Sequence, residues 1–254
     1  MILRDEAIVE LPTPTGPMRT AVFRPAAEGR FPGLVLFSEI FQITNPIRRM
    51  AASLAGNGYI VAVPEVYHEL EPAGTVLTYD TAGADRGNAH KSAKTLASYD
   101  GDARAVLDYL QSHPDCTGKL GTMGICLGGH LAFRAAMNPD VSAGVCFYAT
   151  DIHTRTLGLG QSDNTLDRIG EIKAELLMAW GRQDPHVPRE GRRAIYDALS
   201  DAGASFQWHE FNGAHAFLRD EGPRYDPALA RLAYTLVFDL LGRALSASTE
   251  ENGH

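Results

Sequence analysis

The stretch Gly124-Ile125-Cys126-Leu127-Gly128-Gly129 decides the fold. It follows a buried strand predicted at Lys119–Met123 and opens a helix predicted at Leu127–Met137, so it is a tight strand-to-helix turn. Such a turn needs small residues beside its central position, and Gly124 and Gly128 supply them. The central residue of a Gly-x-Ser-x-Gly turn is a nucleophile. Cys126 occupies that position, where the positive end of the helix favours a thiolate and later an oxyanion.

The alternative interpretation of Cys126 is a buried, unreactive thiol, because cysteine is among the residue types most often buried. The turn pattern favours the nucleophile. Cys116 lies in a predicted loop without such a pattern, and Cys146 lies inside a predicted strand. Both are therefore predicted to be structural. The chain has three cysteines and no closely spaced pair, which indicates neither a disulfide framework nor a zinc or redox pair. We therefore expect no metal and no cofactor.

Strands and helices alternate on both sides of this turn. Two antiparallel strands are predicted first, at Ala7–Leu11 and Arg19–Arg24, with a Pro- and Gly-rich turn between them. Short apolar runs then alternate with helical periodicity, which predicts a mainly parallel central sheet flanked by helices on both faces. Together with the turn at Cys126, this arrangement is typical of an α/β-hydrolase fold. Further strands are predicted at Gly33–Phe37, Tyr59–Val63, Ala143–Phe147, Ala174–Trp180 and Phe206–Glu210, and further helices at 45–56, 99–110, 189–199 and 229–240.

Residues 1–245 are predicted to form a single domain, because the chain has no internal repeat and no long linker. The segment 64–98 is rich in Gly, Thr and Asp and interrupts the alternation. It is predicted to be an irregular insert near the active site, since long inserts of this kind often cover one. The polar end of the chain, 246–254, is predicted to be a disordered tail.

A thiol nucleophile needs a base, and the base needs an acid that orients it. In this fold the acid and then the base follow the nucleophile, each on a loop after a later strand. Asp184 follows the strand that ends near Trp180, and a helix-capping role is its alternative. His215 follows the last predicted strand. Its rivals are His209, inside that strand, and His186, which is too close to Asp184 in sequence to be its natural partner.

A metal site is the weaker interpretation of the same region. Cys126 and His130 are four residues apart on the predicted helix, but no third ligand is near them in the sequence. We expect His130 to pack against the sheet.

These residues resemble the dienelactone hydrolase family, from the strand at Phe31 to the last helix. The resemblance rests on Ser38-Glu39-Ile40-Phe41, on the cysteine turn, on Gly181-Arg182-Gln183-Asp184 and on Gly213-Ala214-His215-Ala216-Phe217. The cysteine is its most specific point, because most α/β-hydrolases carry serine there.

The resemblance implies roles for further residues. Glu39 matches a glutamate that contacts the resting thiol and helps to convert it to a thiolate when substrate arrives. The backbone N–H groups of Ile40 and Leu127 match the oxyanion hole. Arg86 and Arg219 match two arginines that bind a substrate carboxylate, and His90 stands where the family often has tyrosine. The alternative for each arginine is an ordinary surface position.

The amino-acid composition narrows the possible cellular location and binding partners of the protein. The 254-residue chain has a net charge of -8 and 44% hydrophobic residues, so a nucleic-acid backbone would be repelled. We identify no signal peptide and no apolar run long enough to span a membrane. The sequence therefore predicts a cytoplasmic protein that binds a small molecule rather than nucleic acid or membrane, as a monomer or homodimer.

The predicted function is hydrolysis of a small ester or lactone, carrying a carboxylate as a dienelactone does, through a Cys126-His215-Asp184 triad and an acyl-enzyme. A promiscuous carboxylesterase or a phosphoester hydrolase could use the same triad. A thiol redox protein would need a second cysteine near the turn, and a non-catalytic binding protein would normally have lost a triad residue. This sequence has no second cysteine near the turn, and all three triad residues are present.

Overall fold

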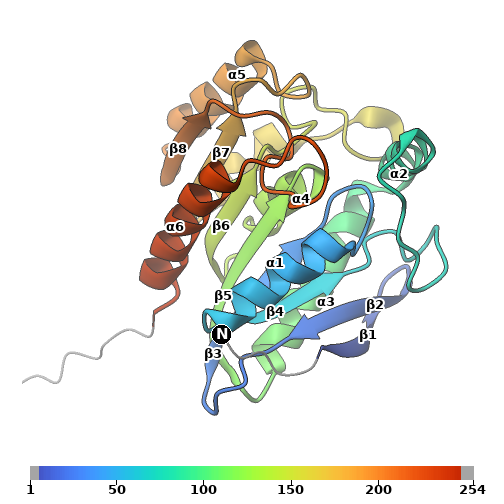
Figure 1. Ribbon diagram of the computed structural model, residues 1–254, viewed down its shortest axis with the longest axis vertical. Coiled ribbons are helices and arrows are strands. Elements are labelled where there is room, and N and C mark those ends of the chain that lie inside the picture. The colour runs from blue at the N-terminus through green and yellow to red at the C-terminus, as the bar shows by residue number, and fades with distance from the viewer. Residues whose placement is uncertain (1–5, 247–254) are drawn as a thin grey trace, which may run out of the picture.

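One sheet organises the molecule, with strands in the order β1-β2-β4-β3-β5-β6-β7-β8 (Figure 1). The computed structural model describes residues 6–246, and all statements below refer to these residues. The strands from β4 through β3 to β8 pair in parallel, while β1 and β2 add an antiparallel edge. The strands are β1 (Ala7–Thr13), β2 (Gly16–Phe23), β3 (Phe31–Phe37), β4 (Ile60–Pro64), β5 (Cys116–Ile125), β6 (Val141–Phe147), β7 (Glu175–Gly181) and β8 (Phe206–Phe211).

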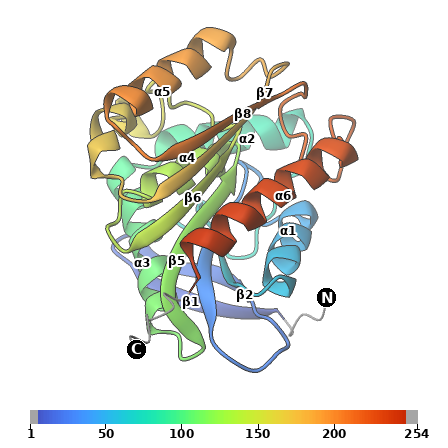
Figure 2. The same cartoon turned by 90° about the vertical axis from the view of Figure 1, so that its left-hand side faces the viewer.

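Helices cover both faces of the sheet, as Figure 2 shows from the side. On one face α1 (Asn45–Gly56) and α6 (Pro227–Ala244) form a core with residues such as Ile47 and Leu240. On the other face, α3 (Leu96–Ser112), α4 (Leu127–Ala135) and α5 (Arg189–Asp201) form the second core. Because both faces are covered, the central strands are continuous apolar runs; all five residues of β4 are buried. The predicted α/β-hydrolase fold is confirmed.

The segment 64–98 differs from its prediction. After β4 and a loop, residues Thr81–Ala93 form helix α2, and α3 already begins at Leu96, so the prediction of an irregular insert is wrong there. The Asp80 carboxylate begins α2 by accepting a hydrogen bond of 2.8 Å from the N–H of Gly83. Only two residues of α2 are buried, and both are glycines. A helix that packs through glycine leaves no apolar periodicity for the sequence to reveal.

The close packing of α2 depends on these glycines. A Cβ at Gly83 would lie 2.0 Å from the carbonyl oxygen of Thr78, and one at Gly87 would lie 2.5 Å from that of Ile40. Two short 3-10 helices, η1 (Leu159–Gln161) and η2 (Thr165–Glu171), complete the fold between β6 and β7. Of the predicted tail 246–254, residues 247–254 lie outside the described residues.

Candidate active site

Cys126 lies at the sharp turn between β5 and α4. Its backbone has φ 58° and ψ -124°, a strained conformation for a residue with a side chain. The turn leaves no space for side chains beside it: a Cβ at Gly124 would lie 1.9 Å from the carbonyl oxygen of Gly128. Cys126 is partly exposed, whereas Cys116 and Cys146 are buried. The two glycines are thus the local reason that the chain can present a cysteine in this conformation.

Asp184 and His215 meet at the same edge of the sheet. The Asp184 loop follows β7 and the His215 loop follows β8, and His215 Nδ1 lies 2.7 Å from Asp184 Oδ2. Asp184 Oδ1 also accepts a 2.8 Å hydrogen bond from the N–H of His186. Both side chains are buried. These contacts fix the carboxylate and orient the imidazole, as an acid–base pair requires.

The charges around His215 favour its protonated form. Burial lowers the pKa of His215, but the negative charge of Cys126 and the hydrogen bonds with Asp184 and Cys126 outweigh it and raise the pKa to about 10. Burial alone would raise the pKa of Asp184, yet the hydrogen bond and charge of His215 lower it. The surroundings therefore favour the imidazolium form of His215 and the carboxylate form of Asp184.

A cavity of about 340 Å³ joins this group to solvent. Cys126 and His215 line it together with Glu39 and Ile40 from the loop after β3. Leu127 is the first residue of α4, so its N–H is one of the helix's first donors and has no partner within the helix. Ile40 lies on the loop after β3 and Leu127 directly follows Cys126 at the start of α4, and their N–H groups stay the predicted oxyanion donors.

Glu39 is a buried carboxylate in the wall of this cavity. Tyr79 donates a 2.9 Å hydrogen bond to Glu39 Oε2, and Arg219 Nη1 lies 3.6 Å from Oε1. The Arg219 guanidinium also stacks on the Tyr79 ring at 4.1 Å. Burial raises the pKa of Glu39, although Arg219 and Tyr79 oppose the increase. Tyr79 lies in a loop without a recognisable motif, so sequence reasoning did not identify it.

Arg86 and His90 do not line the cavity. Both bind the buried Glu71 carboxylate, with 2.6 Å from Arg86 Nη2 to Glu71 Oε2. Since α2 is a helix, the residues it directs to the cavity are spaced by four and three positions and lie on another face: Ala84, Asn88 and Lys91. The resemblance pointed to the correct segment but to the wrong face of it.

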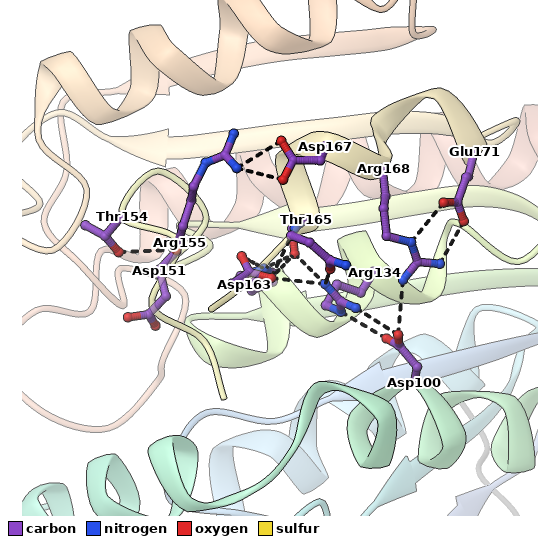
Figure 3. Close-up of polar contacts among 12 residues, drawn as sticks. Asp100, Arg134, Asp151, Thr154, Arg155, Asp163, Thr165, Asp167, Arg168 and Glu171 are labelled. Atoms are coloured by element: carbon purple, nitrogen blue, oxygen red, sulfur yellow. Dashed lines mark hydrogen bonds and ion pairs between the residues drawn. The ribbon is translucent and has the colours of Figure 1, made fainter. Parts of the chain in front are cut away.

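The loop after β6 forms another part of the cavity wall. Its Asp151 and Thr154 line the cavity, and Asp151 accepts hydrogen bonds of 3.0 Å from Lys91 Nζ through both carboxylate oxygens. Figure 3 shows how the following residues are fixed: Arg155 binds Asp167 at 2.7 Å. Neither Asp151 nor Lys91 belongs to a recognisable motif, so sequence reasoning missed both.

Among the described residues, two groups of side chains resemble metal sites in their residue types. In each group the potential ligands already contact other protein groups, so neither fits a metal site. The His130 ring uses both nitrogens, at 2.9 Å from the Thr150 carbonyl oxygen and 2.7 Å from Thr165 Oγ1, so it forms no site with Cys126. The second group consists of His68, Glu69 and Asp102. There the ammonium of Lys94 already supplies a cation, 2.8 Å from Asp102 Oδ2 and bound to Glu69.

Comparison with known proteins identifies the family of this chain. Residues 18–245 match the model of the dienelactone hydrolase family. The chain belongs to the dienelactone hydrolase family. Within it, a protein of Saccharomyces cerevisiae provisionally named carboxymethylenebutenolidase is 41% identical over 239 residues, which cover 90% of this chain and 87% of that protein. The carboxymethylenebutenolidase of Pseudomonas sp. (strain P51) is 27% identical over 220 residues, covering 85% and 87%.

A solved structure shows the same fold. The crystal structure of a provisionally named dienelactone hydrolase from Klebsiella pneumoniae has a TM-score of 0.82 and 21% identity, covering 96% of this chain and all of that one. The predicted resemblance is confirmed, and this family member is a hydrolase of ester or lactone bonds. Within residues 6–246, no helix has the length and apolar character needed to cross a membrane.

Proposed function

We propose that this hydrolase cleaves a small carboxylate-bearing ester or lactone by nucleophilic catalysis, with Cys126 as nucleophile, His215 as base and acid, and Asp184 as the orienting group. The observation that supports this most strongly is the 2.7 Å contact between His215 Nδ1 and Asp184 Oδ2, beside a cysteine on a strained turn in the same cavity. A cytoplasmic location and a monomeric or homodimeric state stay predictions.

The reaction proceeds in two halves. The Cys126 thiolate attacks the substrate carbonyl carbon, and the carbonyl electrons move to the oxygen, which accepts hydrogen bonds from the N–H groups of Ile40 and Leu127. The carbonyl reforms, the bond to the alcohol or enol oxygen breaks, and the His215 imidazolium protonates that oxygen. In the second half, His215 takes a proton from water, whose oxygen attacks the thioester and releases the acid from Cys126.

Glu39 supports the charge distribution of this site. Its carboxylate is held by Tyr79 and Arg219 and lies close enough to His215 for their charges to interact. A negative charge there favours the imidazolium form of His215. Conversion of a resting thiol to the thiolate by Glu39 remains a proposal that follows from the family resemblance.

Turnover of p-nitrophenyl acetate and of cis-dienelactone tests the proposal. Cys126→Ala should lower kcat/KM on both by at least about 1,000-fold, because no other group can form the acyl-enzyme. Wild-type enzyme quenched during turnover should carry an acetyl group on the Cys126 peptide by mass spectrometry. Cys116→Ala is the matched control, because that thiol is buried away from the cavity. Wild-type rates in Cys126→Ala would refute the proposal, and faster turnover of diethyl p-nitrophenyl phosphate than of either ester would favour the phosphoester alternative.

A further inference from the structure

Three long cationic side chains line the cavity, and two of them already have a carboxylate partner within the protein. Lys91 donates to both oxygens of Asp151 at 3.0 Å. Arg219 lies 3.6 Å from Glu39 and donates a 3.0 Å hydrogen bond from Nε to the Glu221 carbonyl oxygen, with Tyr79 against its face. A substrate carboxylate that approached either group would have to displace a protein carboxylate or compete with one.

Arg224 is the third cation, and its situation is different. Within residues 6–246, its guanidinium has neither a hydrogen bond nor an ion pair, although it lines the same cavity as Cys126 and His215. The positive charge of Arg224 acts on His186 and on Glu39 inside the site. Burial chiefly lowers the pKa of His186, and His215 and Arg224 lower it further; against the buried Glu39, Arg224 is one of the cations that oppose the increase in pKa.

The loop that carries Arg224 is tied to the rest of the protein. Arg49 on α1 binds the Asp220 carboxylate at 2.6 and 2.8 Å and the Glu221 carboxylate at 2.7 Å. Further along, the N–H of Asp226 donates a 3.1 Å hydrogen bond to the Phe217 carbonyl oxygen before α6 begins. The backbone is therefore held to the rest of the protein on both sides of Arg224.

We propose that Arg224 binds the anionic group of the substrate and thereby sets the preference for carboxylate-bearing esters or lactones. A planar guanidinium can donate two parallel hydrogen bonds to a carboxylate. Among the residues that the structure describes, Arg224 is the cation of this cavity without an acidic partner, in a chain of net charge -8 whose overall field opposes an anionic ligand. Arg219 is then a positioning residue for Glu39, and Arg86 stabilises α2 through Glu71. This assignment rests on the proposed function.

The test compares one lactone in two forms, cis-dienelactone and its neutral carboxamide, which differ in charge at one group. Arg224→Gln should lower kcat/KM on the carboxylate about ten- to a hundred-fold, and at least about tenfold more than on the carboxamide. The loss should appear mainly in KM, and Arg224→Lys should recover part of it. The exposed Arg193, whose side chain is 80% accessible on α5, provides the control: Arg193→Gln removes the same charge far from the cavity.

The outcomes separate this proposal from the proposed function. Equal losses on the two substrates in Arg224→Gln, or charge discrimination that disappears in Arg86→Gln or Arg193→Gln, would overturn the role of Arg224 and leave the cysteine mechanism intact. Full turnover of both substrates by Cys126→Ala would instead refute the proposed function. Because Arg224 is exposed, Arg224→Gln should keep the wild-type Tm, so a loss of activity reports on binding rather than on folding.

Discussion

At the scale of single residues, the protonation of His215 should depend on Cys126. The negative sulfur and the Asp184 carboxylate raise the pKa of this buried histidine to about 10. In Cys126→Ala the burial remains while one negative partner disappears, so the pKa of His215 should fall toward or below its ordinary value of about 6.5. An NMR titration of the His215 ring proton measures the shift, with Cys116→Ala as the control. An unchanged pKa in Cys126→Ala would show that Cys126 carries no charge beside His215.

The same shift affects stability with a definite sign. The folded protein holds the proton of His215 more tightly than the unfolded chain, because the pKa is higher in the folded state. The resulting stabilisation is fully present below the unfolded pKa of about 6.5 and is lost as pH rises through the folded value of about 10. Urea unfolding of wild type should therefore show a steeper loss of unfolding free energy across this interval than unfolding of Cys126→Ala.

At the scale of elements, the contact between α4 and β3 depends on a missing side chain. A Cβ at Gly128 would lie 2.2 Å from the carbonyl oxygen of Phe37 and 2.5 Å from that of Ser38. Since these are backbone atoms, Gly128→Ala must move the helix away from the strand, at a cost of about 3 kcal/mol in unfolding free energy. The shift also moves the loop with Ile40, so kcat/KM should fall.

Gly242→Ala is the matched control for this prediction. Gly242 is an exposed residue of α6 with nothing within 4 Å of an added Cβ. The substitution should stabilise the helix by about 0.5–1 kcal/mol and leave kcat/KM at the wild-type value. Urea denaturation and ester turnover measure both effects, and similar stability changes in the two variants would contradict the packing argument.

At the scale of the whole molecule, a network of charges connects α3, α4 and the segment between β6 and β7. Arg134 on α4 binds Asp100 on α3 at 2.8 Å, and it reaches Asp163 at 3.0 Å and Thr165 at 2.8 Å in the segment between β6 and β7 (Figure 3). The Arg134 and Asp163 side chains are almost fully buried. Arg134→Met would leave the Asp163 carboxylate with less compensation and should cost about 3–5 kcal/mol of unfolding free energy.

A second ion pair in the same segment allows a direct comparison. Arg155 and Asp167 form a 2.7 Å contact, but their side chains are 48% and 58% exposed. Water screens this pair, so Arg155→Met should cost at most about 1 kcal/mol. Urea unfolding of the two variants measures the difference; equal costs would show that burial does not determine the strength of this network.

The sequence by itself determined the alternation of strands and helices and the strand-to-helix turn at Cys126. Gly124 and Gly128 specify that turn locally, because only residues without a Cβ fit beside Cys126. Asp184 and His215 could also be predicted, since each directly follows a strand, and the carboxyl ends of parallel strands meet at one edge of the sheet. Short-range patterns are sufficient for these features.

Tertiary structure alone decided which charged groups meet. Helix α2 packs through glycines and shows no apolar pattern, so its cavity-facing side could not be identified before the fold was known. Arg86 binds Glu71, 15 residues away, and Lys91 binds Asp151, 60 residues away. No local rule gives such partners. Periodicity and turn chemistry act over a few residues, whereas the partner of a long charged side chain depends on where the whole chain places its opposite charge.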